Sequence, residues 1–517
     1  MSVAEVVQQE KPFTRSDALF EELKVLLSSS GTMALSHYDV EEMVRTKGLA
    51  VMRALLGDHL DLRAQAERGA PALKVVGEDQ VERPQQRDTT RPLETVFGAV
   101  TVGRIGYRAR GTNSRFPLDA SLNLPRDYFS FGVRQRVAEA AVQGSFESAA
   151  RNVTATTGAR VAKRQAEELT ALAAQDFDEF YADSAARAVP VCDPNKLVAL
   201  GFDGKGLVMR VEDLREPTRK AAQQRRRKKA HRLSRGEKKN AKRMAQVATV
   251  YTLDRHVRTA EDIVGDLHGS DGKRPKRPRP EAKRVWASVE KEPETVIEQA
   301  FDEAHRRDPA HAARWVALVD GLPAQLALVR KVAHKKRVKL TVVLDIIHVL
   351  EYLWRATTAF NAQDSPESDE WVTERLLRIL RGEASQVAAG MRRSATLRGL
   401  AESERAAVDK CADYLLKNAK YMRYDEYLAA GLPIATGVVE GAVRHLVNDR
   451  MDITGARWSL RGAEAVLRLR SLWASGDLEE YWRFHKRREY ERNHAAGYAG
   501  GVPPSPHDRR RHLQLVP

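Results

Sequence analysis

The chain has 517 residues, of which 42% are hydrophobic, and its 86 lysines and arginines outnumber its 70 acidic residues to give a net charge of +16. This hydrophobic content excludes a disordered chain, and only two cysteines, Cys192 and Cys411, exclude a disulfide-stapled secreted domain or a zinc ribbon. The basic excess favours a polyanionic partner, with nucleic acid first and an anionic membrane surface second.

Neither a membrane segment nor a targeting segment stands out. No apolar run approaches the roughly 20 residues that span a bilayer, and the opening MSVAEVVQQEKPFTR lacks the apolar core of a signal peptide. We therefore expect a cytoplasmic protein that works under reducing conditions and has free access to DNA.

The N-terminal region, residues 1–130, is predicted to be mainly helical. Apolar residues recur at helical spacing between about 15 and 70. A polar loop is expected near 76–92, and the alternation in LETVFGAVTVGRIGYRAR then indicates a β-hairpin.

Residues 132–177 are predicted to form three helices, separated at Gly144 and at 157–158. The pattern fits a helix-turn-helix whose last helix carries Arg160, Lys163 and Arg164 toward the major groove of DNA. It fits a plain helical hairpin with a solvated basic face equally well.

After residue 190 the chain is expected to alternate strands and helices. NKLVALGFDGKGLVMRVED predicts two strands around a turn at 203–206, and AQVATVYTLD predicts a third. A helix over about 281–307, the strand ARWVALVDG, the helix PAQLALVRKVAHKKR and the strand KLTVVLD follow, and 346–430 is helical. This order indicates an α/β fold with a mixed sheet, in the element order of the RNase H-like fold.

Two basic segments interrupt this region. REPTRKAAQQRRRKKAHRLSRGEKKNAKR is too highly charged to pack in a core and is expected to project, and GKRPKRPRPEAKR is broken by prolines and therefore extended. DNA phosphates are the expected partners of the first segment. Its predicted contact residues are Arg225, Arg226, Arg227, Lys228 and Lys229.

Three carboxylates stand where this element order would place an active site. Asp203 ends the first strand, Asp320 ends WVALVD, and Glu440 lies on the helix GVVEGAVRHLV. Alone, each has a structural explanation, as a turn aspartate or as a helix partner of Arg444. Together they can bind two Mg²⁺ ions and cut a phosphodiester. We therefore predict that these three residues are catalytic and hold Mg²⁺, for which Mn²⁺ can substitute.

Asp345 also ends a strand, and His348 falls at the third position of the next helix. The two residues are either a helix cap with a nearby histidine or an accessory pair that steers DNA or assists proton transfer. Asp320 is favoured as the second carboxylate because the fourth strand of an RNase H-like sheet lies beside the first. The assignment of Asp345 in place of Asp320 stays open.

The blocks VALVDGLPAQL, TVVLDIIHVLEYLW and TGVVEGAVRHLVNDRMDITGARWSLRGAEAVLRLRSLW resemble bacterial insertion-sequence transposases of the ISKra type, relatives of the Mutator-like DDE transposases. The resemblance covers roughly 195–475 and is most specific at Arg450, Gly455, Arg457 and Trp458. It implies that Asp203, Asp320 and Glu440 are the DDE triad and that Asp345 and His348 form its accessory D-x-x-H element.

The resemblance further implies a bacterial, nucleoid-associated protein that does not bind membranes, and it implies a function and partners. The partners would be double-stranded DNA, as terminal inverted repeats and as target, and at least a second copy of the chain in a synaptic dimer. The triad would cut and join the ends of the element by Mg²⁺-dependent phosphoryl transfer. Arg444 and Arg457 would contact DNA, and Trp458 would either stack on a base or belong to the core.

The expected organisation has six parts. These are a helical region with a hairpin (1–130), a helix-turn-helix-like region (131–190), an RNase H-like core (191–345, with the basic insert 215–245), a helical insertion (346–430), the C-terminal part of the core (431–490) and a flexible tail (491–517). An inactive transposase-derived DNA-binding protein and an RNase H-like nuclease without strand transfer are the alternative functions.

Overall fold

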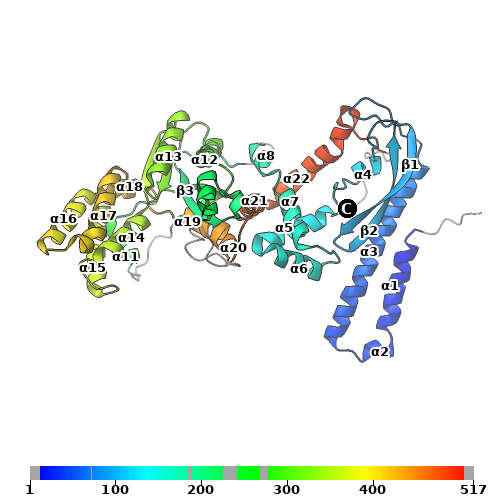
Figure 1. The fold of residues 1–517 in the computed structure, drawn as a ribbon, viewed down its shortest axis with the longest axis horizontal. Coiled ribbons are helices and arrows are strands. Elements are labelled where there is room, and N and C mark those ends of the chain that lie inside the picture. The colour runs from blue at the N-terminus through cyan, green and yellow to red at the C-terminus, as the bar shows by residue number, and fades with distance from the viewer. Residues whose placement is uncertain are drawn as a thin grey trace, which may run out of the picture. The chain divides into compact units, whose positions relative to one another are not determined.

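The computed structural model describes residues 12–71, 73–183, 189–224, 241–267, 277–453 and 455–505. The chain forms two compact units, one of Met1–Ala186 with Glu479–Pro517 and one of Arg187–Leu478 (Figure 1). No helix in the described ranges is long and apolar enough to cross a membrane.

The first unit begins with a helical hairpin followed by a β-hairpin. Its elements are α1 (Thr14–Leu27), α2 (Ser30–Met33), α3 (His37–Gly69), β1 (Gln85–Thr95) and β2 (Gly98–Arg108). Strand β1 begins inside the segment that was expected to be a polar loop, so that expectation was wrong for 85–92. Its first residues are polar because they face solvent, while their backbone groups pair with β2 from Gln85 opposite Arg108 onward.

A three-helix cluster completes the N-terminal half of this unit. It consists of α5 (Phe131–Gln143), α6 (Phe146–Thr156) and α7 (Lys163–Ala173), preceded by α4 (Pro117–Ser121) and followed by α8 (Phe177–Ala182). Ser130 and Ser145 cap α5 and α6 with their side chains. The predicted separations at Gly144 and 157–158 are confirmed, and Val137, Val153 and Leu169 belong to the shared core.

The C-terminal segment of the chain returns to this first unit. Helix α22 (Leu478–Asn493) and the short turns η4 (Ala495–Gly497) and η5 (Ala499–Gly501) follow one another. Residues 479–490 therefore belong to the first unit and not, as expected, with 431–478, and the tail that was expected to be flexible from 491 forms helical turns as far as Gly501. Burial explains this, because Tyr498 is 4% exposed beside Val75 and Tyr107, and the Tyr481 hydroxyl donates to the Ala173 carbonyl at 2.6 Å.

The second unit is built on a mixed five-stranded sheet, and the protein is a mixed α/β structure. The strands are β3 (Leu197–Val208), β4 (Lys242–Leu253), β5 (Glu281–Ser288), β6 (Arg314–Val319) and β7 (Leu340–Leu344), in the order β5-β4-β3-β6-β7. Strands β3, β4 and β5 pair antiparallel, whereas β6 and β7 run parallel to β3.

Two predictions about these strands were wrong. The chain does not turn at 203–206, because β3 continues through this stretch and pairs with β4 as far as Val208 opposite Lys242. At Gly206 the lack of a side chain leaves room for Lys242 on the paired strand, because a Cβ atom there would lie 2.8 Å from Lys242 Cδ. The helix expected over 281–307 begins only at Pro293, because 281–288 forms the edge strand β5.

Helices surround the sheet and fill the interval after β7. They are η1 (Val211–Asp213), α9 (Glu216–Gln223), α11 (Ala260–Leu267), α12 (Pro293–Arg307), α13 (Pro323–Lys335), α14 (Ile346–Thr357), α15 (Pro366–Leu380), α16 (Ala384–Leu397), α17 (Glu402–Asn418), η2 (Ala419–Tyr421), α18 (Tyr424–Ala429), α19 (Gly437–Ala442), the π-helical turn η3 (Val443–Asn448), α20 (Asp449–Met451) and α21 (Leu460–Ser475). Only helices and connecting segments lie between Ile346 and Ala429. Most of the basic insert lies outside the described residues.

Candidate metal and acid–base site

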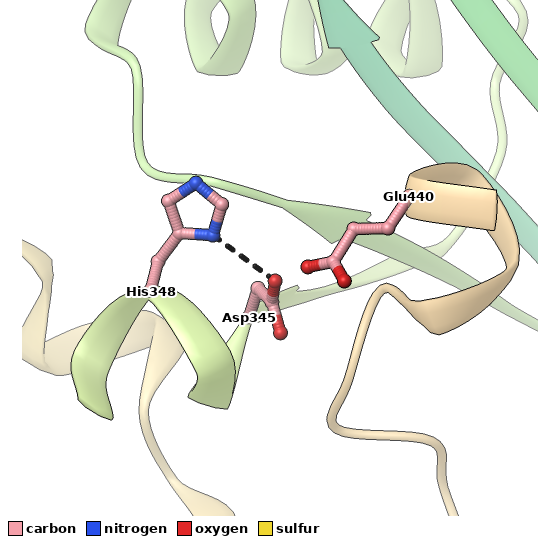
Figure 2. Close-up of side chains that lie close together, drawn as sticks. All are labelled: Asp345, His348 and Glu440. Atoms are coloured by element: carbon pink, nitrogen blue, oxygen red, sulfur yellow. Dashed lines mark hydrogen bonds and ion pairs between the residues drawn. The ribbon is translucent and has the colours of Figure 1, made fainter. Parts of the chain in front are cut away.

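Asp345 lies directly after β7 and begins helix α14 as its N-cap. Its Oδ1 accepts a hydrogen bond from the backbone N–H of Ile347 at 3.0 Å. His348 stands at the third position of α14, and its Nδ1 lies 3.1 Å from Asp345 Oδ2 (Figure 2). Asp345 is therefore the predicted helix cap, and the same carboxylate also contacts His348.

Thr436 connects Asp345 to the helix that carries Glu440. Its backbone N–H donates to Asp345 Oδ1 at 3.2 Å, its hydroxyl contacts Asp345 Oδ2, and the same hydroxyl lies 3.1 Å from Glu440 Oε1. Together with Ile347 and His348, these donors occupy both oxygens of the fully buried Asp345 carboxylate. A hydroxyl has a single proton to donate, so it bridges both carboxylates fully only when one of them carries a proton.

Asp345, His348 and Glu440 form a compact group that can hold a metal ion. One ligand atom from each lies within 4.8 Å of the others. Figure 2 shows the Glu440 carboxyl group pointing toward the Asp345–His348 pair from the opposite side. Asp345 is buried, His348 is half-buried and Glu440 is exposed, so the group opens to solvent on the Glu440 side.

Asp203 and Asp320 lie at neighbouring strands of the same sheet. The parallel pairing of β3 with β6 ends at Gly201 opposite Leu318, and each aspartate follows two residues later on its own chain segment. Asp203 lies inside β3 rather than at its end, which corrects the sequence prediction, whereas Asp320 directly follows β6. Both side chains are half-buried.

The pKa of Asp203 is raised, first by burial and further by the negative charge of Asp320, while His348 opposes the shift. The two aspartates and the histidine therefore act on one another electrostatically. Asp320 Oδ1 accepts the Leu322 backbone N–H at 2.8 Å, and the Tyr414 hydroxyl donates to the Asp320 carbonyl at 2.9 Å. These bonds hold the turn after β6 in place.

Helix α19 reaches the sheet at a glycine. A Cβ atom on Gly201 would lie 3.1 Å from Val439 Cβ and 2.7 Å from Thr249 Oγ1. The missing side chain therefore admits the helix that carries Glu440 to the strand that carries Asp203. The π-helical turn η3 follows α19 directly, and such turns are frequent at functional sites.

The pKa values of His348 and Glu440 are both raised. The hydrogen bond to Asp345 raises the pKa of His348 to about 9 against the opposing effect of burial. Burial raises the pKa of Glu440, and the neighbouring Asp345 carboxylate raises it further. Without a metal, His348 is therefore an imidazolium at neutral pH, next to a carboxyl group that holds its proton more tightly than usual.

The predicted DNA contacts of the three-helix cluster are exposed but already have acidic neighbours. Lys163 lies 4.0 Å from Glu147, and Arg164 lies 3.0 Å from Glu168. Arg160 stands in the connection before α7 and not in the helix, which corrects its predicted position. Exposed pairs of this kind are weak and can exchange partners.

The predicted DNA contacts around Glu440 divide into exposed and buried residues. Arg444 and Arg457 are exposed, and Arg444 lies 3.9 Å from Asp449, while Glu440 is hydrogen-bonded to Thr436. Trp458 is only 6% exposed, and its indole N–H donates to the Met451 carbonyl at 3.0 Å. Base stacking by Trp458 is therefore wrong, because its ring belongs to the core. The predicted contacts Arg225, Arg226, Arg227, Lys228 and Lys229 lie outside the described residues.

Thr436 and Tyr414 are the site residues that sequence reasoning missed. Thr436 precedes Glu440 by four residues, and this spacing predicts that the two side chains are neighbours on one helix face. Tyr414 lies far along the chain on α17, and only folding brings its ring against Tyr352, with ring centroids 4.0 Å apart.

No family model matches the chain, and no curated protein matches it.

Proposed function

We propose that the chain is an insertion-sequence DDE transposase whose Arg187–Leu478 unit is an RNase H-like catalytic domain. The observation that carries this proposal is the meeting of Asp203, Asp320, Asp345, His348 and Glu440 at one edge of a mixed sheet. The order β5-β4-β3-β6-β7 supports it, because an antiparallel meander followed by two parallel strands is the order expected of this fold.

The hydrogen bonds favour Asp203, Asp320 and Glu440 as the metal ligands, with Asp345 as a positioning residue. Both oxygens of Asp345 already accept hydrogen bonds. Asp320 uses one oxygen for the Leu322 N–H, and Asp203 uses one for the N–H of Gly204, so each has a second oxygen available. Carboxylate oxygens are the ligands that Mg²⁺ prefers.

The residues present fit a divalent cation in two ways. The three carboxylates offer oxygen donors that suit Mg²⁺ or Mn²⁺, whereas the compact group adds the His348 imidazole, a nitrogen donor that suits transition metals and not Mg²⁺. Bound cations would polarise the scissile phosphate and lower the pKa of the attacking hydroxyl or water. The raised pKa values of Asp203 and Glu440 mean that a cation would compete with protons at these two groups.

His348 would act on DNA as a cation. Asp345 holds its Nδ1, which leaves Nε2 to face a ligand. As an imidazolium it can donate a hydrogen bond to a phosphate oxygen, or a proton to the leaving 3′ oxygen. Its position in the first turn of α14 adds the positive end of the helix dipole to the same place.

A cleavage assay tests the proposal. Purified full-length protein is mixed with a duplex carrying the ends that flank its own gene, in Mg²⁺, Mn²⁺ or EDTA. We expect metal-dependent nicking at the ends, followed by joining of the freed 3′ hydroxyl to a second duplex. Asp203→Asn, Asp320→Asn and Glu440→Gln should each reduce the rate by at least about 10²-fold, since each removes a group that acts in the transition state.

Asp345→Asn separates the two assignments of the second carboxylate. As a positioning residue it should slow cleavage less than Asp320→Asn does. An inactive Asp345→Asn beside an active Asp320→Asn would transfer the metal-ligand role to Asp345. Wild-type protein that binds the ends and never cuts, with either metal, would refute the proposed catalysis. Cutting without end specificity or joining would identify a nuclease instead.

A further inference from the structure

A basic pocket lies within the unit of Met1–Ala186 and Glu479–Pro517. It has a volume of about 510 Å³, within the range of ligand-binding pockets. Strands β1 and β2 contribute Arg91 and Arg104 to its wall, and the segment around α4 contributes Arg115, Asp119 and Arg126. Residues at the end of α22 and after it complete the wall, so two stretches far apart in the sequence, 78–126 and 492–498, build one cavity.

Positive charge exceeds negative charge in this wall. The guanidinium groups of Arg91 and Arg104 share the single carboxylate of Asp119. Arg126 is exposed and has no ion-pair partner among the described residues. The pocket therefore has a surplus of cationic donors that the protein itself does not neutralise.

Two of these arginines are also poorly hydrated. Arg91 and Arg104 are each 14% exposed, and the buried Nε of Arg104 has no acceptor among the described residues. Burial, together with the charge of Arg91, lowers the pKa of Arg104 to about 10. Two like charges held close together in a poorly hydrated place are costly, and the one carboxylate of Asp119 compensates for them only in part.

The donors are held in position before any ligand arrives. The Arg104 guanidinium lies 3.8 Å from the centre of the Phe116 ring, and the Arg91 Nη2 donates to the Asp127 carbonyl at 2.7 Å. The Arg115 Nε donates to the Gly497 carbonyl at 2.6 Å. Fixed guanidinium forks match the oxygens of a phosphate, and their ordering cost is met on folding.

We propose that this pocket binds a phosphate group, between Arg91, Arg104 and Arg126. A phosphate supplies several acceptor oxygens and about two negative charges, which suits two poorly hydrated guanidinium groups that share one carboxylate and the exposed, unpaired Arg126. The same chemistry occurs in a free nucleotide and at the 5′ end of a nucleic acid strand. The inference is independent of the carboxylate site, and it requires no metal.

Calorimetric titration of the full-length chain in EDTA tests this inference. The probes are inorganic phosphate, a 5′-mononucleotide, and a short duplex with or without 5′ phosphates. Arg126→Glu removes the unpaired charge from the pocket without disturbing a buried group. The matched control is Arg110→Glu, an exposed arginine of the same unit that does not line the pocket.

We expect saturable binding of at least one phosphate probe, weakened by about tenfold or more in Arg126→Glu and unchanged in Arg110→Glu. Arg91→Gln should weaken it too, with folding verified by circular dichroism. A phosphorylated duplex that binds tighter than the same duplex without 5′ phosphates identifies a strand end as the source, and saturable binding of the mononucleotide without such a difference identifies a nucleotide. No saturable binding, or equal effects of Arg126→Glu and Arg110→Glu, would overturn the inference, whatever the cleavage assay gives.

Discussion

The imidazole of His348 is hydrogen-bonded to the fully buried carboxylate of Asp345, with 3.1 Å between Nδ1 and Oδ2. The same carboxylate caps α14 and accepts from Thr436, so the chain segments after β7 and before α19 meet at Asp345. The pKa of His348 is therefore raised only while the folded chain holds Asp345 beside it.

Stability should fall with rising pH through the pair of His348 and Asp345. The folded pKa of His348 is about 9, whereas an unfolded histidine titrates near about 6.5. The contribution is therefore fully present below the unfolded pKa and is lost as pH rises through about 9. Urea unfolding of metal-free wild type and His348→Gln at several pH values measures it.

The two unfolding free energies should differ most at low pH within this window and converge above it. A constant difference between wild type and His348→Gln from pH 6 to 10 would contradict the assigned pairing. Proton titration of His348 by NMR, repeated in Asp345→Asn, is the direct measurement. There the pKa should fall toward its ordinary value.

Metal binding should stabilise the second unit, by about 2.7 kcal/mol when the free ion is at 100 times its Kd. Thermal unfolding with Mn²⁺ or Mg²⁺ against EDTA measures this shift. Glu440→Gln should reduce the shift, because Glu440 belongs to both possible ligand sets. The matched control Glu402→Gln changes an exposed glutamate of α17 and should leave the shift unchanged.

His348→Gln and Asp203→Asn then separate the two ligand sets. Loss of the metal-induced shift in Asp203→Asn, with retention in His348→Gln, assigns the ion to the oxygen ligands. The opposite result assigns it to the compact group of Asp345, His348 and Glu440. A full shift in Glu440→Gln would rule out both.

Gly201→Ala should displace α19 and impair cleavage. The new methyl group would press on Val439 and on Thr249, neither of which is the end of a long flexible chain. We expect a loss of about 1–3 kcal/mol of stability and at least about tenfold slower cleavage, because Glu440 moves with the helix. Gly441→Ala on the same helix meets open space and should be neutral or slightly stabilising. Equal behaviour of the two variants in unfolding and cleavage assays would show that the close contact is unimportant.

Trp458→Ala should act on stability and not on DNA contacts. Its ring lies 4.8 Å from the Arg450 guanidinium, and its backbone pairs with Val208 and Arg210 beside β3. Removal should cost about 3–5 kcal/mol in denaturant unfolding. Trp473→Ala, on the half-exposed Trp473 of α21, should cost much less. For Trp458→Phe, DNA affinity should match wild type at a temperature where both are folded, and a specific loss of affinity would restore the stacking role.

Local sequence patterns correctly predicted those helices and strands that depend on interactions between residues close together in the chain. Continuous apolar runs predicted β6 and β7, the cap at Asp345 predicted the start of α14, and Gly144 predicted a break between helices. Each depends on side-chain spacing or on hydrogen bonds within a few residues. The α/β class with a mixed sheet followed from the order of such elements and is confirmed.

The elements that were predicted incorrectly depend on contacts between residues far apart in the chain. Edge strand β5 was predicted as a helix because AKRVWAS carries no clear period, and its pairing with β4 determines its conformation. The meander has three strands as predicted, and AQVATVYTLD is β4, but the first two predicted strands are the single strand β3, and β5 is the remaining strand. The return of α22 to the first unit had no local signal.

The sequence by itself determined which residues are candidate metal ligands and acid–base groups, because acidic residues that follow apolar strand segments can be identified from the order of residues alone. Only the tertiary structure decided that Thr436 joins Asp345 to Glu440, that Trp458 is buried, and that two stretches far apart in the sequence line the pocket beside Arg104. The physical reason is that burial and charge coupling depend on which surfaces meet, and sequence spacing carries no information about contacts closed by a sheet or by a returning helix.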